Sequence, residues 1–129
     1  MIRLLFYFFA VGEAITGFCL LVLPGMVFAW LFALAQSAGE TLLVGRIAGA
    51  ALLGFSIGCW PIKRSKEEAA MPAQLVGITT YNGTASALLA YAGTALNMSG
   101  ILLWPAVMFH AVLFVWGLAG LRERQRDSQ

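Results

Sequence analysis

Four long runs of apolar residues divide the chain, and each is long enough to cross a membrane. They cover residues 4–23, 41–62, 73–96 and 101–121. About 20 apolar residues cross roughly 30 Å of hydrocarbon as a helix, which satisfies its own backbone hydrogen bonds there. The pattern therefore predicts an all-α integral membrane protein, a bundle of four transmembrane helices in a single domain over residues 1–129.

Apolar residues continue beyond the first run, through the segment 24–36 with the sequence PGMVFAWLFALAQ. One helix over residues 2–35 would be about 50 Å long, which exceeds the hydrocarbon thickness. We therefore expect a bend at Pro24-Gly25 and then a short apolar segment along the outer membrane surface, with Trp30 as an interfacial anchor. A tilted extension of the first span is the alternative.

Polar residues and a proline mark where the middle spans begin. Ser37 and Glu40 match the S-x-x-E capping box, in which both side chains bond free N–H groups at a helix start, so they predict the start of the second span. Pro72 predicts the start of the third span. Proline has no backbone N–H, and in the first turn of a helix an N–H group would have no partner within the helix anyway.

The composition agrees with a membrane protein, and the basic residues give it a direction. Hydrophobic residues make up 60% of the chain and charged residues 11%, unlike a soluble domain. Of the eight basic residues, one precedes the first span, three lie between spans two and three, and three follow span four, so seven share one side. These seven are Arg3, Lys63, Arg64, Lys66, Arg122, Arg124 and Arg126. The positive-inside rule predicts that the N- and C-termini lie in the cytoplasm. The sequence has no interleaved basic face, so we do not expect it to bind nucleic acid.

Small residues are abundant in the second span. Gly45 with Gly49, and Gly54 with Gly58, form two GxxxG pairs. In lipid, small side chains let helix backbones approach closely, and this packing drives association. The glycines either pack the span within its own bundle or form a face for another membrane subunit or a second copy of the chain.

Every predicted span also places a polar side chain inside the membrane. These residues are Glu13, Arg46, Tyr81, Asn82 and His110. Glu13 and His110 are each the tenth residue of their span, near the midplane, where a charged side chain costs about 2.5–3.5 kcal/mol. That cost predicts that the polar side chains meet, and we expect the long side chain of Arg46 to pair with Glu13.

Helical spacing places further polar and small residues of the third span on one stripe. The stripe consists of Thr79, Asn82, Ser86, Ala90 and Gly93. Residues three and four apart lie on one helix face, so we expect this face to contact protein and not lipid.

The intramembrane polar residues permit three interpretations. They form a buried network that fixes helix register without a ligand, a midplane cavity that holds a lipid-like or quinone-like molecule or carries protons, or a contact with a partner protein. No metal site is expected, because one His and the distant Cys19 and Cys59 cannot supply a zinc or bis-His haem site. No nucleophile motif accompanies His110, so we do not expect an enzyme.

Three strings carry a resemblance to a known family: RIAGAALLGFSIGCW (residues 46–60), YNGTASALLAYAG (81–93) and SGILLWPAVMFHAVL (99–113). Over spans two to four the chain resembles the DoxX-like small four-span membrane proteins of bacteria. The resemblance implies a four-helix bundle in the plasma (inner) membrane of a bacterium and, from some members, a small subunit of a quinone-linked respiratory complex. It assigns no catalytic residue to this sequence.

Small multidrug exporters are a second comparison, since they also have four spans and a membrane Glu in the first, as Glu13 is here. Those exporters work as antiparallel dimers with nearly balanced basic residues, whereas seven basic residues share one side here. They also lack an intramembrane Arg and His like Arg46 and His110.

These observations favour a small non-catalytic membrane subunit or scaffold, whose polar cluster packs the bundle or holds a lipid-like or quinone-like ligand. The alternative is a proton-coupled small-molecule transporter that uses Glu13.

Overall fold

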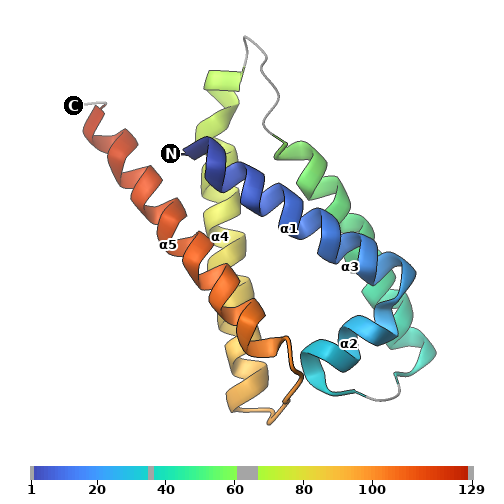
Figure 1. Cartoon of the computed structure of the whole chain (residues 1–129). Helices are drawn as coiled ribbons and strands as arrows, with labels where there is room; N and C mark the ends of the chain where they lie inside the picture. Colours follow the sequence, from blue (N-terminus) through green and yellow to red (C-terminus); the bar gives the residue numbers. More distant parts are fainter. Residues whose placement is uncertain (1, 35–36, 61–66, 128–129) are drawn as a thin grey trace.

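The computed structural model describes residues 2–34, 37–60 and 67–127, and its elements are α-helices (Figure 1). In chain order these helices are α1 (Ile2–Val22), α2 (Pro24–Phe32), α3 (Gly39–Gly58), α4 (Glu67–Thr94) and α5 (Leu103–Asp127). Within the described ranges, three helices are long and apolar enough to cross a membrane: α1, α3 and the part of α5 from Leu103 to Arg126. The all-α prediction is confirmed, and these apolar helices indicate a membrane protein.

The bend after the first helix lies at Leu23. This residue leaves the helical conformation, with φ −129° and ψ 52°, and Pro24 begins α2. Proline suits the first helical position because the N–H it lacks would have no partner there. α2 ends at Ala33, whose φ of 58° is left-handed and whose N–H donates to the Ala29 carbonyl oxygen at 3.0 Å. The apolar segment after the first helix is therefore a separate short helix.

The second predicted span starts where expected, since α3 begins at Gly39 within the predicted capping box, but the box itself does not form, and the predicted start of the third span is wrong. The residue before α3 is Ala38, which makes no side-chain cap, and the Ser37 hydroxyl has no hydrogen-bond partner. Glu40 still lies in the first turn of α3, where its charge suits the positive end of the helix dipole. α4 begins at Glu67 and takes Pro72 into its second turn, so the helix loses one backbone hydrogen bond but continues.

The long helices pack as two pairs, α1 with α3 and α4 with α5 (Figure 1). In the first pair Gly17 faces Gly49: a Cβ atom on either glycine would lie 2.8 or 2.6 Å from the carbonyl oxygen of the other. In the second pair Gly117 lies directly against Thr79, and Gly83 lies against the ring of Phe114. Small residues thus set the close approach within each pair, as is typical of membrane helices.

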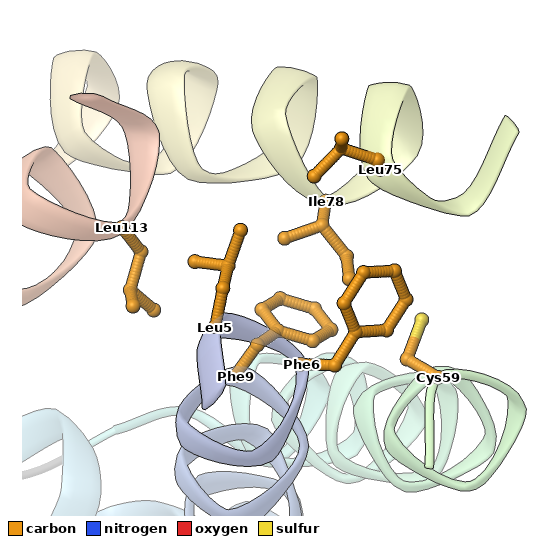
Figure 2. Close-up of a cluster of buried hydrophobic side chains, with 7 residues drawn as sticks. All are labelled: Leu5, Phe6, Phe9, Cys59, Leu75, Ile78 and Leu113. Atoms are coloured by element: carbon orange, nitrogen blue, oxygen red, sulfur yellow. The ribbon is translucent and has the colours of Figure 1, made fainter. Parts of the chain in front are cut away.

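An apolar core joins the two pairs near the start of α1 (Figure 2). Its buried residues are Leu5, Phe6, Phe9, Cys59, Leu75, Ile78 and Leu113. The three core residues of α1 lie within its first eight residues. The next residue on the same helix face is Glu13, one turn beyond Phe9, so the core ends where a buried carboxyl group begins.

At the opposite end of the molecule, α2 contacts both pairs. The Leu102 N–H donates to the Trp30 carbonyl oxygen at 2.9 Å, and Gly100 lies directly against the backbone of Trp30 and Leu31. On the other side, the ring of Phe28 packs against Gly45 of α3.

Large apolar side chains cover much of the outside of the long helices. Examples more than half exposed are Leu4, Phe8, Ile15, Phe18, Val44, Ile47, Ile57, Leu88, Met108, Val112 and Val115. Exposed apolar surface of this extent indicates contact with lipid.

Candidate functional site

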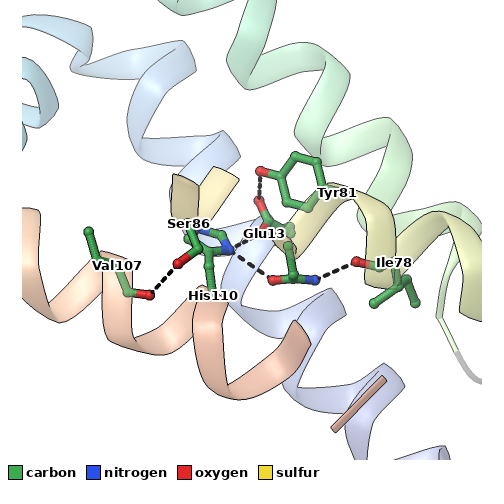
Figure 3. Close-up of polar contacts among 7 residues, drawn as sticks. Glu13, Ile78, Tyr81, Ser86, Val107 and His110 are labelled. Atoms are coloured by element: carbon green, nitrogen blue, oxygen red, sulfur yellow. Dashed lines mark hydrogen bonds and ion pairs between the residues drawn. The ribbon is translucent and has the colours of Figure 1, made fainter. Parts of the chain in front are cut away.

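Four polar side chains meet where the two helix pairs face each other (Figure 3). Glu13 comes from α1, Tyr81 and Asn82 from α4, and His110 from α5. We call these four residues the polar cluster.

Glu13 is the most distant of the four in sequence and is almost fully enclosed, with 2% of its surface exposed. The Tyr81 hydroxyl donates to its Oε2 atom at 3.0 Å, and His110 Nδ1 lies 4.0 Å from its Oε1 atom. The rings of Phe9 and Phe55 pack edge-on against the Tyr81 ring, with centroids 5.7 and 5.5 Å away. Aromatic packing from α1 and α3 therefore positions the hydroxyl group that reaches Glu13.

Asn82 connects the cluster to the α4 backbone. Its amide Nδ2 donates to the Ile78 carbonyl oxygen at 2.8 Å, and its Oδ1 atom lies 2.8 Å from His110 Nδ1. Because a carbonyl oxygen only accepts, the amide orientation is determined by Ile78 and the Asn82 oxygen faces the ring. Asn82 therefore holds His110 beside Glu13.

The predicted stripe on the third span faces α5. Thr79 is buried, and its hydroxyl donates to the Leu75 carbonyl oxygen at 2.7 Å within α4. The Ser86 hydroxyl donates across to the Val107 carbonyl oxygen of α5 at 3.2 Å. Thr79 and Ser86 were not predicted as members of the polar site, although their helical spacing from Asn82 was the signal that marked this face.

Arg46 does not join the polar cluster, and its predicted pairing with Glu13 is wrong. Its side chain is exposed on α3. The α3 residues that face the protein are Gly45, against Phe28 of α2, and Gly49, against α1. Arg46 lies about 100° around the helix from Gly45, and its exposed side chain extends beside these contacts and not into them. Tyr81 and His110 take the place beside Glu13 that Arg46 was expected to fill.

The structure separates the two GxxxG pairs of the second predicted span. Gly45 and Gly49 are buried within the protein. Gly54 and Gly58 are exposed, and a Cβ atom added to either would meet no atom within 4 Å. The first pair packs the chain internally, and the second lies on its outer face.

The cluster is largely satisfied from within. Among the described residues, the enclosed side-chain nitrogen or oxygen without a hydrogen bond is Ser37 Oγ, outside the cluster. In the same part of the chain, no group of three His, Cys, Asp or Glu residues comes together to hold a metal ion. Geometrically, the cluster can cross-link helices, and its carboxyl and imidazole groups can hold a proton.

Comparison of the chain with protein-family models, with curated proteins and with solved structures finds no match.

Proposed function

We propose that the protein is a small non-catalytic subunit or scaffold of the bacterial plasma membrane, whose polar cluster holds two helix pairs in one arrangement. The observation that carries this proposal is the hydrogen bond from Tyr81 to Glu13. It joins α4 to α1, two helices that pack mainly against other partners. The bond therefore acts between the pairs, at a depth where water does not compete for either group.

The proposed bundle has four crossings, which are α1, α3, α5 and, in addition, α4. α4 has 28 residues and is about 42 Å long, which is sufficient to cross the hydrocarbon. Its polar residues keep α4 from being one of the three helices that are apolar enough by composition to cross a membrane, but Thr79 and Asn82 are buried against protein. Residues 73–96 contain no charged side chain.

The arrangement of helix ends supports the proposed orientation. The start of α1 and the end of α5 lie toward the same end of the molecule, and α2 lies at the other end (Figure 1). Arg3 is in the first turn of α1, and Arg124 and Arg126 are in the last turn of α5. Under the positive-inside rule this end is cytoplasmic, and α2 with Trp30 lies at the outer interface.

Native mass spectrometry tests the subunit role. We expect the protein, taken from its own membranes in a mild detergent, to carry another membrane protein, in line with the DoxX-like resemblance. Tyr81→Phe should weaken this complex by loosening the scaffold. Tyr91→Phe is the matched control, because Tyr91 lies on the same helix with 56% of its surface exposed. A protein that carries no partner, or equal complexes from both variants, would contradict the proposal.

A proton-coupled small-molecule transporter is the second candidate, because the enclosed Glu13 carboxyl lies 4.0 Å from His110. Intramembrane carboxyl and imidazole groups that lie next to each other in space are typical of proton pathways. In liposomes, a transporter would release protons when substrate is added, and Glu13→Gln would abolish this release. A Glu13→Gln protein that changes only in stability would favour the scaffold.

A further inference from the structure

The two ring nitrogens of His110 have different surroundings. Nδ1 lies 2.8 Å from Asn82 Oδ1. Nε2 has no hydrogen-bond partner among the residues that the structure describes, and it is not one of the enclosed polar atoms. The His110 side chain keeps 13% of its surface exposed, compared with 2% for Glu13. His110 is therefore the member of the pair that an outside molecule can reach.

Asn82 determines which nitrogen carries the hydrogen. Its Nδ2 group donates to the Ile78 carbonyl, so its Oδ1 atom faces the ring and can only accept. Nδ1 must then be the N–H group. In the neutral imidazole, the other nitrogen, Nε2, carries a lone pair and is a hydrogen-bond acceptor.

Within the described ranges, no neighbouring side chain supplies a donor to this lone pair. The Ser86 hydroxyl donates to the Val107 carbonyl, and the Tyr81 hydroxyl donates to Glu13. The rings of Tyr81 and Phe109 meet the His110 ring edge-on, with centroids 5.8 and 5.6 Å away. The acceptor thus lies in an aromatic setting, in the first half of a helix that is apolar enough to cross a membrane.

Among the side chains that the structure describes, the charged group near the ring comes from one helix. α1 contributes Glu13, which faces the Nδ1 side of the ring. The charged residues of α3, Glu40 and Arg46, are exposed, and the described charged residues of α5 lie in its last turns. The Nε2 side of the ring therefore favours a neutral donor.

We propose that His110 Nε2 binds a lipid-soluble alcohol or phenol, an apolar molecule that donates one O–H group, and that Asn82 is the positioning residue that keeps Nε2 an acceptor. Hydrocarbon contains no water to satisfy the lone pair, so a hydroxyl group dissolved in the membrane gains a hydrogen bond there that lipid tails cannot provide. This inference rests on the proposed membrane bundle but not on the role of the Tyr81–Glu13 bond.

The experiment uses the fact that His110 is the only histidine of the chain. In nanodiscs, protein labelled with ¹⁵N-histidine gives one Nδ1 and one Nε2 resonance. We expect Nδ1 to show the shift of an N–H nitrogen and Nε2 that of a bare ring nitrogen. Adding 4-hexylphenol should move the Nε2 resonance and saturate. Its methyl ether, 4-hexylanisole, has the same apolar body without a donor and should bind about five-fold more weakly, the ratio expected for one net hydrogen bond.

Three results would overturn the proposal: an N–H shift at Nε2 in the unliganded protein, N–H shifts at both nitrogens, or equal binding of the phenol and its ether. Asn82→Leu removes the acceptor for Nδ1 and should release the ring to the other tautomer, with loss of the preference for phenol. Asn82→Asp keeps an acceptor for Nδ1 and should retain the N–H there. The measurements on the unaltered protein decide the question even where a variant does not fold. The two proposals fail separately. A Tyr81→Phe protein that behaves like the wild type would refute the scaffold role, but the expected His110 resonances would stay the same.

Discussion

The bond between Tyr81 and Glu13 provides a direct test of how the two helix pairs are held together. Tyr81→Phe removes the hydroxyl group but keeps the ring that packs against Phe9 and Phe55. Hydrogen bonds between membrane helices contribute about 0.6 kcal/mol on average and up to about 1.7 kcal/mol. The variant also leaves one oxygen of an enclosed carboxyl group without a donor, which adds about 1–3 kcal/mol. We expect the free energy of unfolding to fall by about 2 kcal/mol.

Equilibrium unfolding in mixed micelles, followed by far-UV circular dichroism, measures this loss. A double-mutant cycle with Tyr81→Phe and Glu13→Leu, which removes both acceptor oxygens, then isolates the interaction between the two side chains. We expect the double variant to lose about 1 kcal/mol less than the sum of the single losses, because either change alone removes the same bond. Tyr91→Phe removes a hydroxyl from an exposed position of α4 and should change stability by less than about 0.5 kcal/mol. Additive losses in the cycle, or an equal loss from Tyr91→Phe, would refute the reasoning.

Three further predictions address helix packing, the outward arginine and topology. Gly49→Ala should destabilise the protein in the same assay by about 1–3 kcal/mol, because its Cβ would lie 2.6 Å from the Gly17 backbone, whereas Gly54→Ala enters open space and should change stability little. Arg46→Gln should not lower stability, and its effect should add to that of Glu13→Gln. An interaction energy of 1 kcal/mol or more between the two changes would instead show that Arg46 and Glu13 form the ion pair expected from the sequence. A reporter enzyme fused after Gln129 should be active only in the cytoplasm, and activity outside the cell would overturn the orientation.

Several features followed from residue type and spacing alone. Apolar runs of about 20 residues predict helices in any environment that excludes water, because the backbone must pair with itself. Pro24 predicts the break between α1 and α2, since proline cannot donate a backbone hydrogen bond. The cost of a polar group in hydrocarbon marked Glu13, Tyr81, Asn82 and His110 as residues that need partners.

Only the tertiary structure decided which partners those were. The sequence places Arg46 and Glu13 within reach in depth, but the rotation of α3 about its own axis turns Arg46 outward and presents Gly45 and Gly49 to the protein. Likewise, the two GxxxG pairs look alike in sequence, and only at the glycines of the first pair would an added Cβ atom meet another helix. Spacing along one helix defines its faces but not the neighbour that each face meets. That choice depends on how closely whole helices can approach, which here is set by glycines on helices far apart in the chain, such as Gly17 and Gly49.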